Sequence, residues 1–245
     1  MPHLLSRLTI LAWLGCACTA AAQPDIQIVG PERLPYIVDR NGSGSGPAVE
    51  LVRLIARAAG IDQEVRILPF QRAVRQLDEG DTLYPALLRT PPREDLYVWI
   101  GEVFADRAVL FTRRDGPPVS EIAAARRLER ISVMRGSELH GILRSFGLQN
   151  VETNISEDHN ARLLRAERIE AWFTLRAVGR ATWHELGFPP AEIQHGEAFA
   201  LMSFWIAGSR NLPPATVAKL RAAYDGLRQS GAYDRIVAPL REPPS

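Results

Sequence analysis

The stretch 86-ALLRTPPREDLYVWIG-101 changes character at Thr90, where a hydrophobic segment gives way to two prolines and then Arg93. The residues before it, 82–88 (TLYPALL), predict a buried strand. In open parallel sheets, ligands bind beyond the carboxyl ends of the strands. A guanidinium suits a carboxylate because it donates two parallel hydrogen bonds. The stretch therefore predicts an arginine held at the edge of a binding crevice.

Strands and helices alternate along the rest of the chain in two successive series, separated by a break in composition over 112–122. Strands that alternate with helices predict mostly parallel sheets with helices on both faces, and two such series predict two lobes. The expected strands are 25–30, 64–69, 82–88, 107–113, 130–136, 151–156, 169–175, 192–196 and 201–209. The expected helices are 47–60, 70–80, 137–147, one ending near 164, one ending near 186, and 213–230.

The overall composition is that of an ordinary globular protein without a strong charge bias. The chain has 245 residues, of which 46% are hydrophobic, and 29 basic residues balance 28 acidic ones. Such a balance provides no field that would attract nucleic acid or an anionic membrane. We therefore expect neither as a partner, and we expect a monomer.

The first 22 residues have the pattern of a secretory signal peptide. Arg7 precedes an apolar run over 8–17, and alanines at 20 and 22 suit cleavage before Gln23. This pattern predicts export to the periplasm.

Both cysteines of the chain, Cys16 and Cys18, fall inside this segment. A lipid anchor on Cys16 is the alternative to simple cleavage, but Trp13 stands where a lipoprotein signal usually has leucine. Cleavage before Gln23 leaves a protein with no disulfide and no thiol nucleophile.

Several segments follow one another in an order that resembles the periplasmic solute-binding proteins of amino-acid-type ABC transporters, the family 3 binding proteins. These segments are LPYIV, GPAVELV, PFQRAVRQLDEGD, RTPPRED, ISVMRGSELHGIL, LLRAERIEAW and LRQSGAYDRIV. The resemblance implies an α/β, two-lobed periplasmic binding protein fold of type II, with parallel-rich sheets flanked by helices and a two-strand hinge. The first lobe would comprise 23–105 with 203–245, and the second 106–202. The chain would cross between them near Phe104 and Leu201.

The resemblance also implies roles for particular residues. Thr90 and Arg93 match the positions that hold the ligand's α-carboxylate, and Gly136, Ser137 and Glu138 match a turn at a helix start in the second lobe. The N–H groups of such a turn attract an anion. Where many amino-acid binders carry an acid for the α-ammonium, this chain has Leu175, with Thr174 beside it.

Four further residues are candidates for the ligand site. Tyr36, Phe70 and Trp99 would form aromatic walls, and Arg72 would add a second cation that favours a dicarboxylate. Each has a structural alternative, because aromatic residues are usually core and arginines usually form surface ion pairs. Ser137 is equally suited to a simple N-cap.

No motif indicates a cofactor, a metal or a catalytic residue. The segment NGSGSG at 41–46 lacks the Gly-Lys-Ser/Thr of a phosphate loop and reads as a flexible turn. The histidines show no metal-ligand spacing, and no G-x-S-x-G motif occurs.

The sequence thus predicts a binding protein that captures a small carboxylate-bearing solute, an amino acid or a related organic anion, and delivers it to an ABC permease. Three alternatives remain open. One is an enzyme resembling cyclohexadienyl dehydratases, with Glu138, Glu170 or Glu197 as the acid. Another is a protein that presents its ligand to a membrane sensor. The last is a ligand-free interaction protein, in which an internal carboxylate occupies Arg93.

Overall fold

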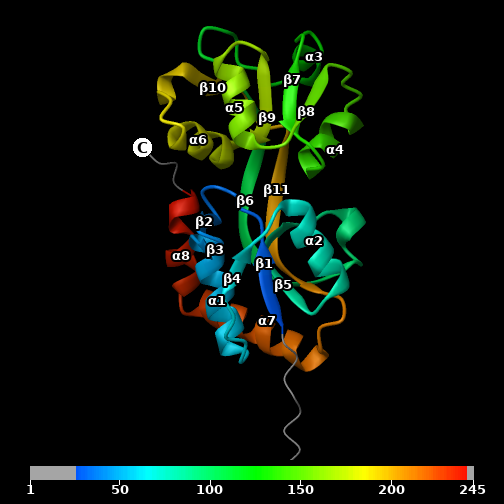
Figure 1. Cartoon of the computed structure of the whole chain (residues 1–245), viewed down its shortest axis with the longest axis vertical. Helices are drawn as coiled ribbons and strands as arrows, with labels where there is room; N and C mark the ends of the chain where they lie inside the picture. Colours follow the sequence, from blue (N-terminus) through cyan, green and yellow to red (C-terminus); the bar gives the residue numbers. More distant parts are fainter. Residues whose placement is uncertain (1–25, 242–245) are drawn as a thin grey trace, which may run out of the picture.

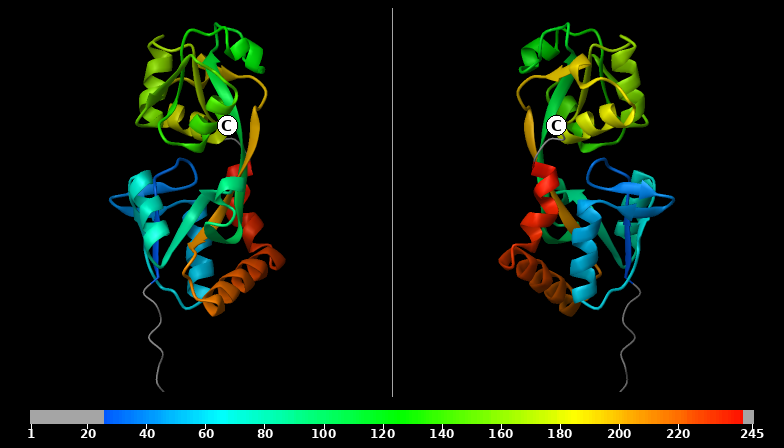
Figure 2. Two further views of the ribbon diagram at one scale, coloured as in Figure 1. Left: turned by 90° about the vertical axis from the view of Figure 1, so that its right-hand side faces the viewer. Right: turned by 90° about the vertical axis from the view of Figure 1, so that its left-hand side faces the viewer.

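The computed structural model describes residues 26–241, which form two lobes stacked along the long axis of the molecule (Figure 1). Two long strands, β6 (Tyr97–Arg113) and β11 (Ala200–Ser209), run from one lobe into the other (Figure 2). The expected signal peptide, with Cys16, lies outside the described residues. Among residues 26–241, no helix combines the length and the apolar character needed to cross a membrane.

The lower lobe of Figure 1 contains the N-terminal strands and helices together with the last two helices of the chain. Its elements are β1 (Gln27–Gly30), β2 (Val38–Arg40), β3 (Ser43–Ser45), α1 (Pro47–Ala58), β4 (Val65–Ile67), α2 (Phe70–Glu79), β5 (Thr82–Leu88), the short 3-10 helix η1 (Pro91–Arg93), α7 (Pro214–Gln229) and α8 (Ala232–Arg241). The upper lobe contains the middle of the chain. Its elements are α3 (Ile122–Ala125), β7 (Ile131–Met134), α4 (Glu138–Ser145), β8 (Val151–Asn154), α5 (Glu157–Arg165), β9 (Ala171–Leu175), α6 (Arg176–Glu185), η2 (Pro190–Glu192) and β10 (Ile193–His195).

The strands among residues 26–241 follow one hydrogen-bonded path, in the order β2-β3-β4-β1-β5-β11-β6-β9-β7-β8, with β10 on β6. Parallel pairs lie inside each lobe: β1 pairs with β4 and β5, and β7 pairs with β8 and β9. The two long strands pair antiparallel with each other and with their neighbours. The sheets are thus mixed, and the expected type II fold is confirmed. The expected strand at 107–113 is wrong in its start, because β6 begins at Tyr97 and spans both lobes without a break.

Local sequence explains several element boundaries. Pro47 opens α1, where its missing N–H costs nothing, and apolar residues on one face of α1 are buried in the lower lobe. Of the segment 41–46, predicted as a flexible turn, only the first two residues connect β2 to β3, and the next three form β3 itself. Asn41 and Gly42 have φ values of 56° and 90° there, the pattern of a two-residue hairpin turn.

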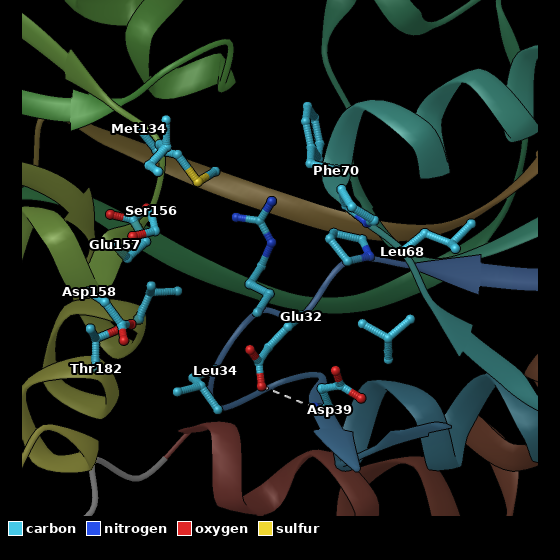
Figure 3. Close-up of a pocket in the computed structure, with 16 residues that line it drawn as sticks. Glu32, Leu34, Asp39, Leu68, Phe70, Met134, Ser156, Glu157, Asp158 and Thr182 are labelled. Carbon is cyan, nitrogen blue, oxygen red and sulfur yellow. Dashed lines mark hydrogen bonds between the residues drawn. The ribbon is translucent and has the colours of Figure 1, made fainter. Parts of the chain in front are cut away.

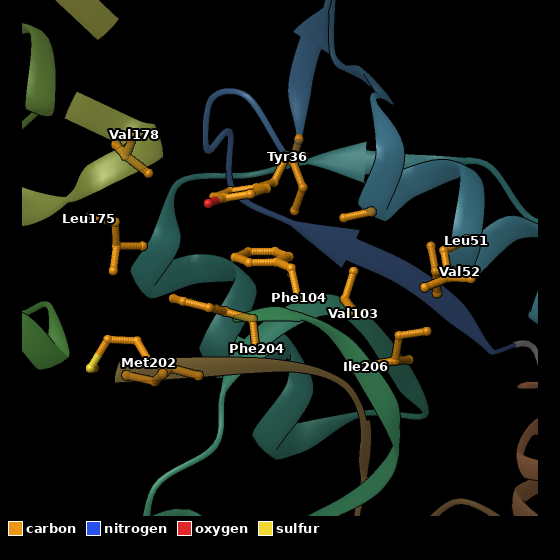
Figure 4. Packing of buried hydrophobic residues seen from close by; sticks show 14 of the residues in the cluster. Tyr36, Leu51, Val52, Val103, Phe104, Leu175, Val178, Met202, Phe204 and Ile206 are labelled. Carbon is orange, nitrogen blue, oxygen red and sulfur yellow. The ribbon is translucent and has the colours of Figure 1, made fainter. Parts of the chain in front are cut away.

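Three stacked aromatic rings lie where the chain passes between the lobes (Figure 4). The ring of Phe104 on β6 lies 3.5 Å from that of Tyr36 and 4.7 Å from that of Phe204 on β11. The Tyr36 hydroxyl donates to Asp106 Oδ2 at 2.7 Å, and the backbone N–H of Ala177, at the start of α6, donates to the same oxygen at 3.0 Å. Asp106 therefore ties a lower-lobe loop to an upper-lobe helix at the crossing.

Candidate ligand-binding site

A cavity of about 470 Å³ lies between the lobes and is lined from both sides (Figure 3). Its walls come mainly from segments that follow the carboxyl ends of β1, β4, β7 and β8, where the ligand sites of α/β sheets occur. The lining residues are Pro31, Glu32, Arg33, Leu34, Asp39, Ile67, Leu68, Pro69 and Phe70 from the lower lobe, and Met134, Ile155, Ser156, Glu157, Asp158, Val178 and Thr182 from the upper lobe.

Arg33 is the cation of this cavity. It follows β1, and the ring of Phe204 lies 5.4 Å from its guanidinium carbon. Among residues 26–241 it forms no ion pair, and its buried Nε has no hydrogen-bond partner. Buried polar groups in native proteins are nearly always hydrogen-bonded. An anionic group in the cavity would supply the missing partner.

Glu157 faces the same cavity from the upper lobe. It is the first residue of α5, whose N-cap is Ser156, and its Oε2 accepts a hydrogen bond from Trp172 Nε1 at 2.8 Å. Burial raises the pKa of this carboxyl, while the hydrogen bond from Trp172 and the charge of Arg33 act in the opposite direction.

Arg93, the arginine that the sequence singled out, is already paired. It forms an ion pair with Glu138 of the upper lobe, and its Nη1 also donates to the carbonyl of Leu88 at 3.3 Å. The exposed fractions of the two side chains are only 18% and 17%. The sequence predicted a guanidinium that is free to bind a solute, whereas in this conformation it is paired with Glu138.

The ion pair belongs to a close contact between the lobes. Gly136, which precedes Ser137 and Glu138, has a φ of +70°, and a Cβ built on it would lie 2.9 Å from Nε2 of Gln71 on α2. The left-handed backbone and the close approach both explain why glycine stands at this position.

We expect Glu138→Gln to shift the ligand-free protein toward a more open form. The substitution removes the charge that attracts Arg93 across the lobes, and a loss of about 1.4 kcal/mol would lower the ratio of closed to open molecules about tenfold. Small-angle X-ray scattering would show a larger radius of gyration.

The matched control is Glu94→Gln, which breaks the Arg89–Glu94 ion pair inside the lower lobe. It should leave the scattering unchanged. Identical curves for Glu138→Gln and the wild type would show that the Arg93–Glu138 pair does not hold the lobes together.

Two of the residues predicted for the site lie at or near the cavity. Phe70 lines it. Thr174 is buried on β9, and its hydroxyl lies close enough to Glu157 to oppose the rise in the pKa of that carboxyl. Ser137 caps α4, because its Oγ accepts the His140 N–H at 3.3 Å and donates to the carbonyl of Met134. Thr90 precedes η1, two residues after the end of β5.

Three other predicted contacts are placed elsewhere by the structure. Tyr36 is 1% exposed and fully engaged by Phe104 and Asp106, so it is a core residue rather than a ligand wall. Trp99 is buried in the lower lobe, where its Nε1 donates to the carbonyl of Glu94 at 3.1 Å. Arg72 is exposed on α2 and does not line the cavity, so it does not provide the second cation that was expected there.

The acids considered for an enzymatic mechanism also lie outside the cavity. Glu170 is exposed and accepts the backbone N–H of Glu129, and Glu197 is exposed near β10. Glu138 is held by Arg93. Within residues 26–241, no group of three or more His, Cys, Asp or Glu side chains is arranged to hold a metal ion.

Sequence reasoning missed Arg33 and Glu157. Arg33 comes three residues after β1, so the strand-end argument that selected Arg93 applies to it equally. Glu157 has the signature of an ordinary acidic first turn of a helix after a serine cap, which hides any second role.

The fold and this interlobe cavity define a bilobal binding protein of the type II class. A family model for bacterial extracellular solute-binding proteins, family 3, matches residues 28–239. The chain therefore belongs to this family, whose members function in the periplasm or outside the cell. No curated protein matches the chain in sequence.

Solved structures with the same fold include both sensors and binding proteins. A histidine kinase sensor domain with similarity to periplasmic binding proteins has a TM-score of 0.77 at 21% identity, over 87% of this chain and 94% of that one. A P235GK mutant of ArgBP from T. maritima has a TM-score of 0.74 at 18% identity, over 87% and 93%. The arginine-, lysine-, histidine-binding protein ArtJ from Geobacillus stearothermophilus also has a TM-score of 0.74 at 18% identity, over 91% and 97%.

Proposed function

We propose that this protein captures a small carboxylate-bearing solute, an amino acid or a related organic anion, between its lobes and presents it to an ABC permease in the periplasm. The observation that carries the proposal is the unpaired guanidinium of Arg33 in an interlobe cavity. Two charge-assisted hydrogen bonds from such a group to a carboxylate are worth roughly 1.5–3 kcal/mol each.

Capture would proceed by hinge closure about the two crossing strands, between lobes divided at 23–105 with 203–245 and at 106–202. A ligand shifts the equilibrium between open and closed forms only by its differential affinity for them. The cavity meets this requirement because residues of both lobes line it, so that a solute contacts all of them only after closure. Presentation to a membrane sensor uses the same capture step and differs only in the partner that reads the closed form.

A thermal-shift screen of the protein from Gln23 onward tests the proposal. The probes are amino acids, dicarboxylates, polyamines and aromatic acids. A solute at about 100 times its dissociation constant should add about 2.7 kcal/mol to the free energy of unfolding. We expect at least one carboxylate-bearing probe to do so.

A stabilising effect from polyamines alone, or from no probe at all, would contradict carboxylate capture. Incubation with prephenate or arogenate provides a separate check on the enzymatic alternative. Formation of a decarboxylated product there would show catalysis, in place of simple binding.

A further inference from the structure

The charge of the interlobe cavity is opposite to that expected for an organic anion. Its lining carries four carboxylates, those of Glu32, Asp39, Glu157 and Asp158, against the single guanidinium of Arg33. A cavity lined mainly by one sign of charge concentrates solutes of the opposite sign and repels like charge. A dicarboxylate is therefore disfavoured, although one carboxylate still has a partner in Arg33.

The two innermost charges face the cavity from opposite lobes. Arg33 comes from the lower lobe, and Glu157 lies on the far wall with Ser156 and Met134 (Figure 3). Burial raises the pKa of Glu157 and the charge of Arg33 opposes that rise, yet among residues 26–241 no ion pair joins the two side chains. A solute with a carboxylate and an amino group would pair with both side chains at once, its carboxylate with Arg33 and its amino group with Glu157.

The other three carboxylates lie nearer to solvent. Glu32, Asp39 and Asp158 are exposed side chains at the edge of the cavity, and Glu32 and Asp39 are joined by a hydrogen bond from the Asp39 backbone N–H at 3.1 Å (Figure 3). They provide negative charge beyond that needed for one amino group. A second cationic group on the solute would face them.

We infer that the cavity selects a cationic amino acid, with its carboxylate on Arg33, its amino group on Glu157 and its charged side chain toward Glu32, Asp39 and Asp158. The inference rests on the proposed function and names its substrate class. It also replaces the expectation of a dicarboxylate, which depended on Arg72 as a second cation.

Isothermal titration calorimetry with four probes tests the substrate class: L-lysine, L-arginine, L-glutamate and cadaverine, which is lysine without its carboxylate. We expect L-lysine or L-arginine to bind at least about 100-fold more tightly than L-glutamate, because the side-chain carboxylate of glutamate would face the like charges of Glu32, Asp39 and Asp158. Cadaverine should bind at least about tenfold more weakly than L-lysine, since it leaves Arg33 unpaired.

Glu157→Gln is the matching variant, and it preserves the shape of the side chain and an oxygen acceptor for Trp172. It should weaken binding of the better basic amino acid at least about tenfold. Glu152→Gln, the same change at an exposed position of β8 away from the cavity, should leave that affinity unchanged.

Two results would overturn the inference: L-glutamate binding as tightly as the basic amino acids, or no heat from L-lysine and L-arginine while another carboxylate binds. Either leaves carboxylate capture standing. Failure of every carboxylate-bearing probe in the wider screen removes the proposed function as well. Glu157→Gln with wild-type affinity would remove Glu157 from the site.

Discussion

Replacing Arg33 with glutamine is expected to lower the affinity for the carboxylate-bearing solute at least about 100-fold. The variant loses both hydrogen bonds that a guanidinium donates to a carboxylate, which together are worth roughly 3 kcal/mol or more. The fold should survive, because the hydrogen bonds of Arg33 with Tyr36 and Ile37 come from its backbone and do not depend on the guanidinium. Calorimetric titration with the probe that stabilises the wild type measures the change.

Arg93→Gln provides the decisive comparison. If Arg93 only bridges the lobes through Glu138, this variant should lose about tenfold in affinity, by favouring the open form. Arg40→Gln, an exposed arginine on β2, is the control for loss of a positive charge near the site and should bind normally. The reverse order, with binding abolished by Arg93→Gln and retained by Arg33→Gln, would restore Arg93 as the carboxylate residue and remove Arg33.

Replacing Trp172 with alanine is expected to lower the free energy of unfolding by about 3–5 kcal/mol. Trp172 lies on β9 with no exposed surface, and its ring is 5.8 Å from that of Phe111. Removing it leaves a cavity that a rigid sheet cannot close. Urea unfolding followed by circular dichroism measures the change, and a loss below about 1 kcal/mol would show that the upper lobe repacks.

Trp172→Phe separates packing from hydrogen bonding. It keeps most of the ring but leaves Glu157 without the indole donor at 2.8 Å. We expect a smaller loss of stability than for alanine, together with weaker binding of the solute, because Glu157 is no longer held in place. A variant that lost stability but bound normally would show that the indole N–H does not position Glu157.

Much of the fold follows from local sequence. The alternation of strands and helices corresponds to the order of elements in the structure. The location of the cavity could also be anticipated, since Pro69-Phe70 follows a predicted strand and lines it. These features depend on hydrophobic periodicity and on turn residues, which act over short distances along the chain.

The candidate site was predicted less well, and the errors share a cause. Tyr36, Trp99 and Arg72 have residue types suited to a ligand site. Residue type does not reveal whether a side chain faces the cavity, the core or the solvent. Tyr36 points into a stack with Phe104, a residue 68 positions later in the chain. Glu138 was considered a ligand contact, and only the approach of the lobes brings it to Arg93.

The sequence by itself determined the family, the two-lobed architecture and the presence of arginines after strand ends. Only the tertiary structure decided which arginine remains unpaired and which carboxylates surround it. The physical reason is that hydrophobic patterning fixes each element locally, whereas the state of a charge depends on every group that folding brings within a few ångströms. Arg93 and Arg33 both follow strands, yet one meets Glu138 across the lobes and the other faces an open cavity.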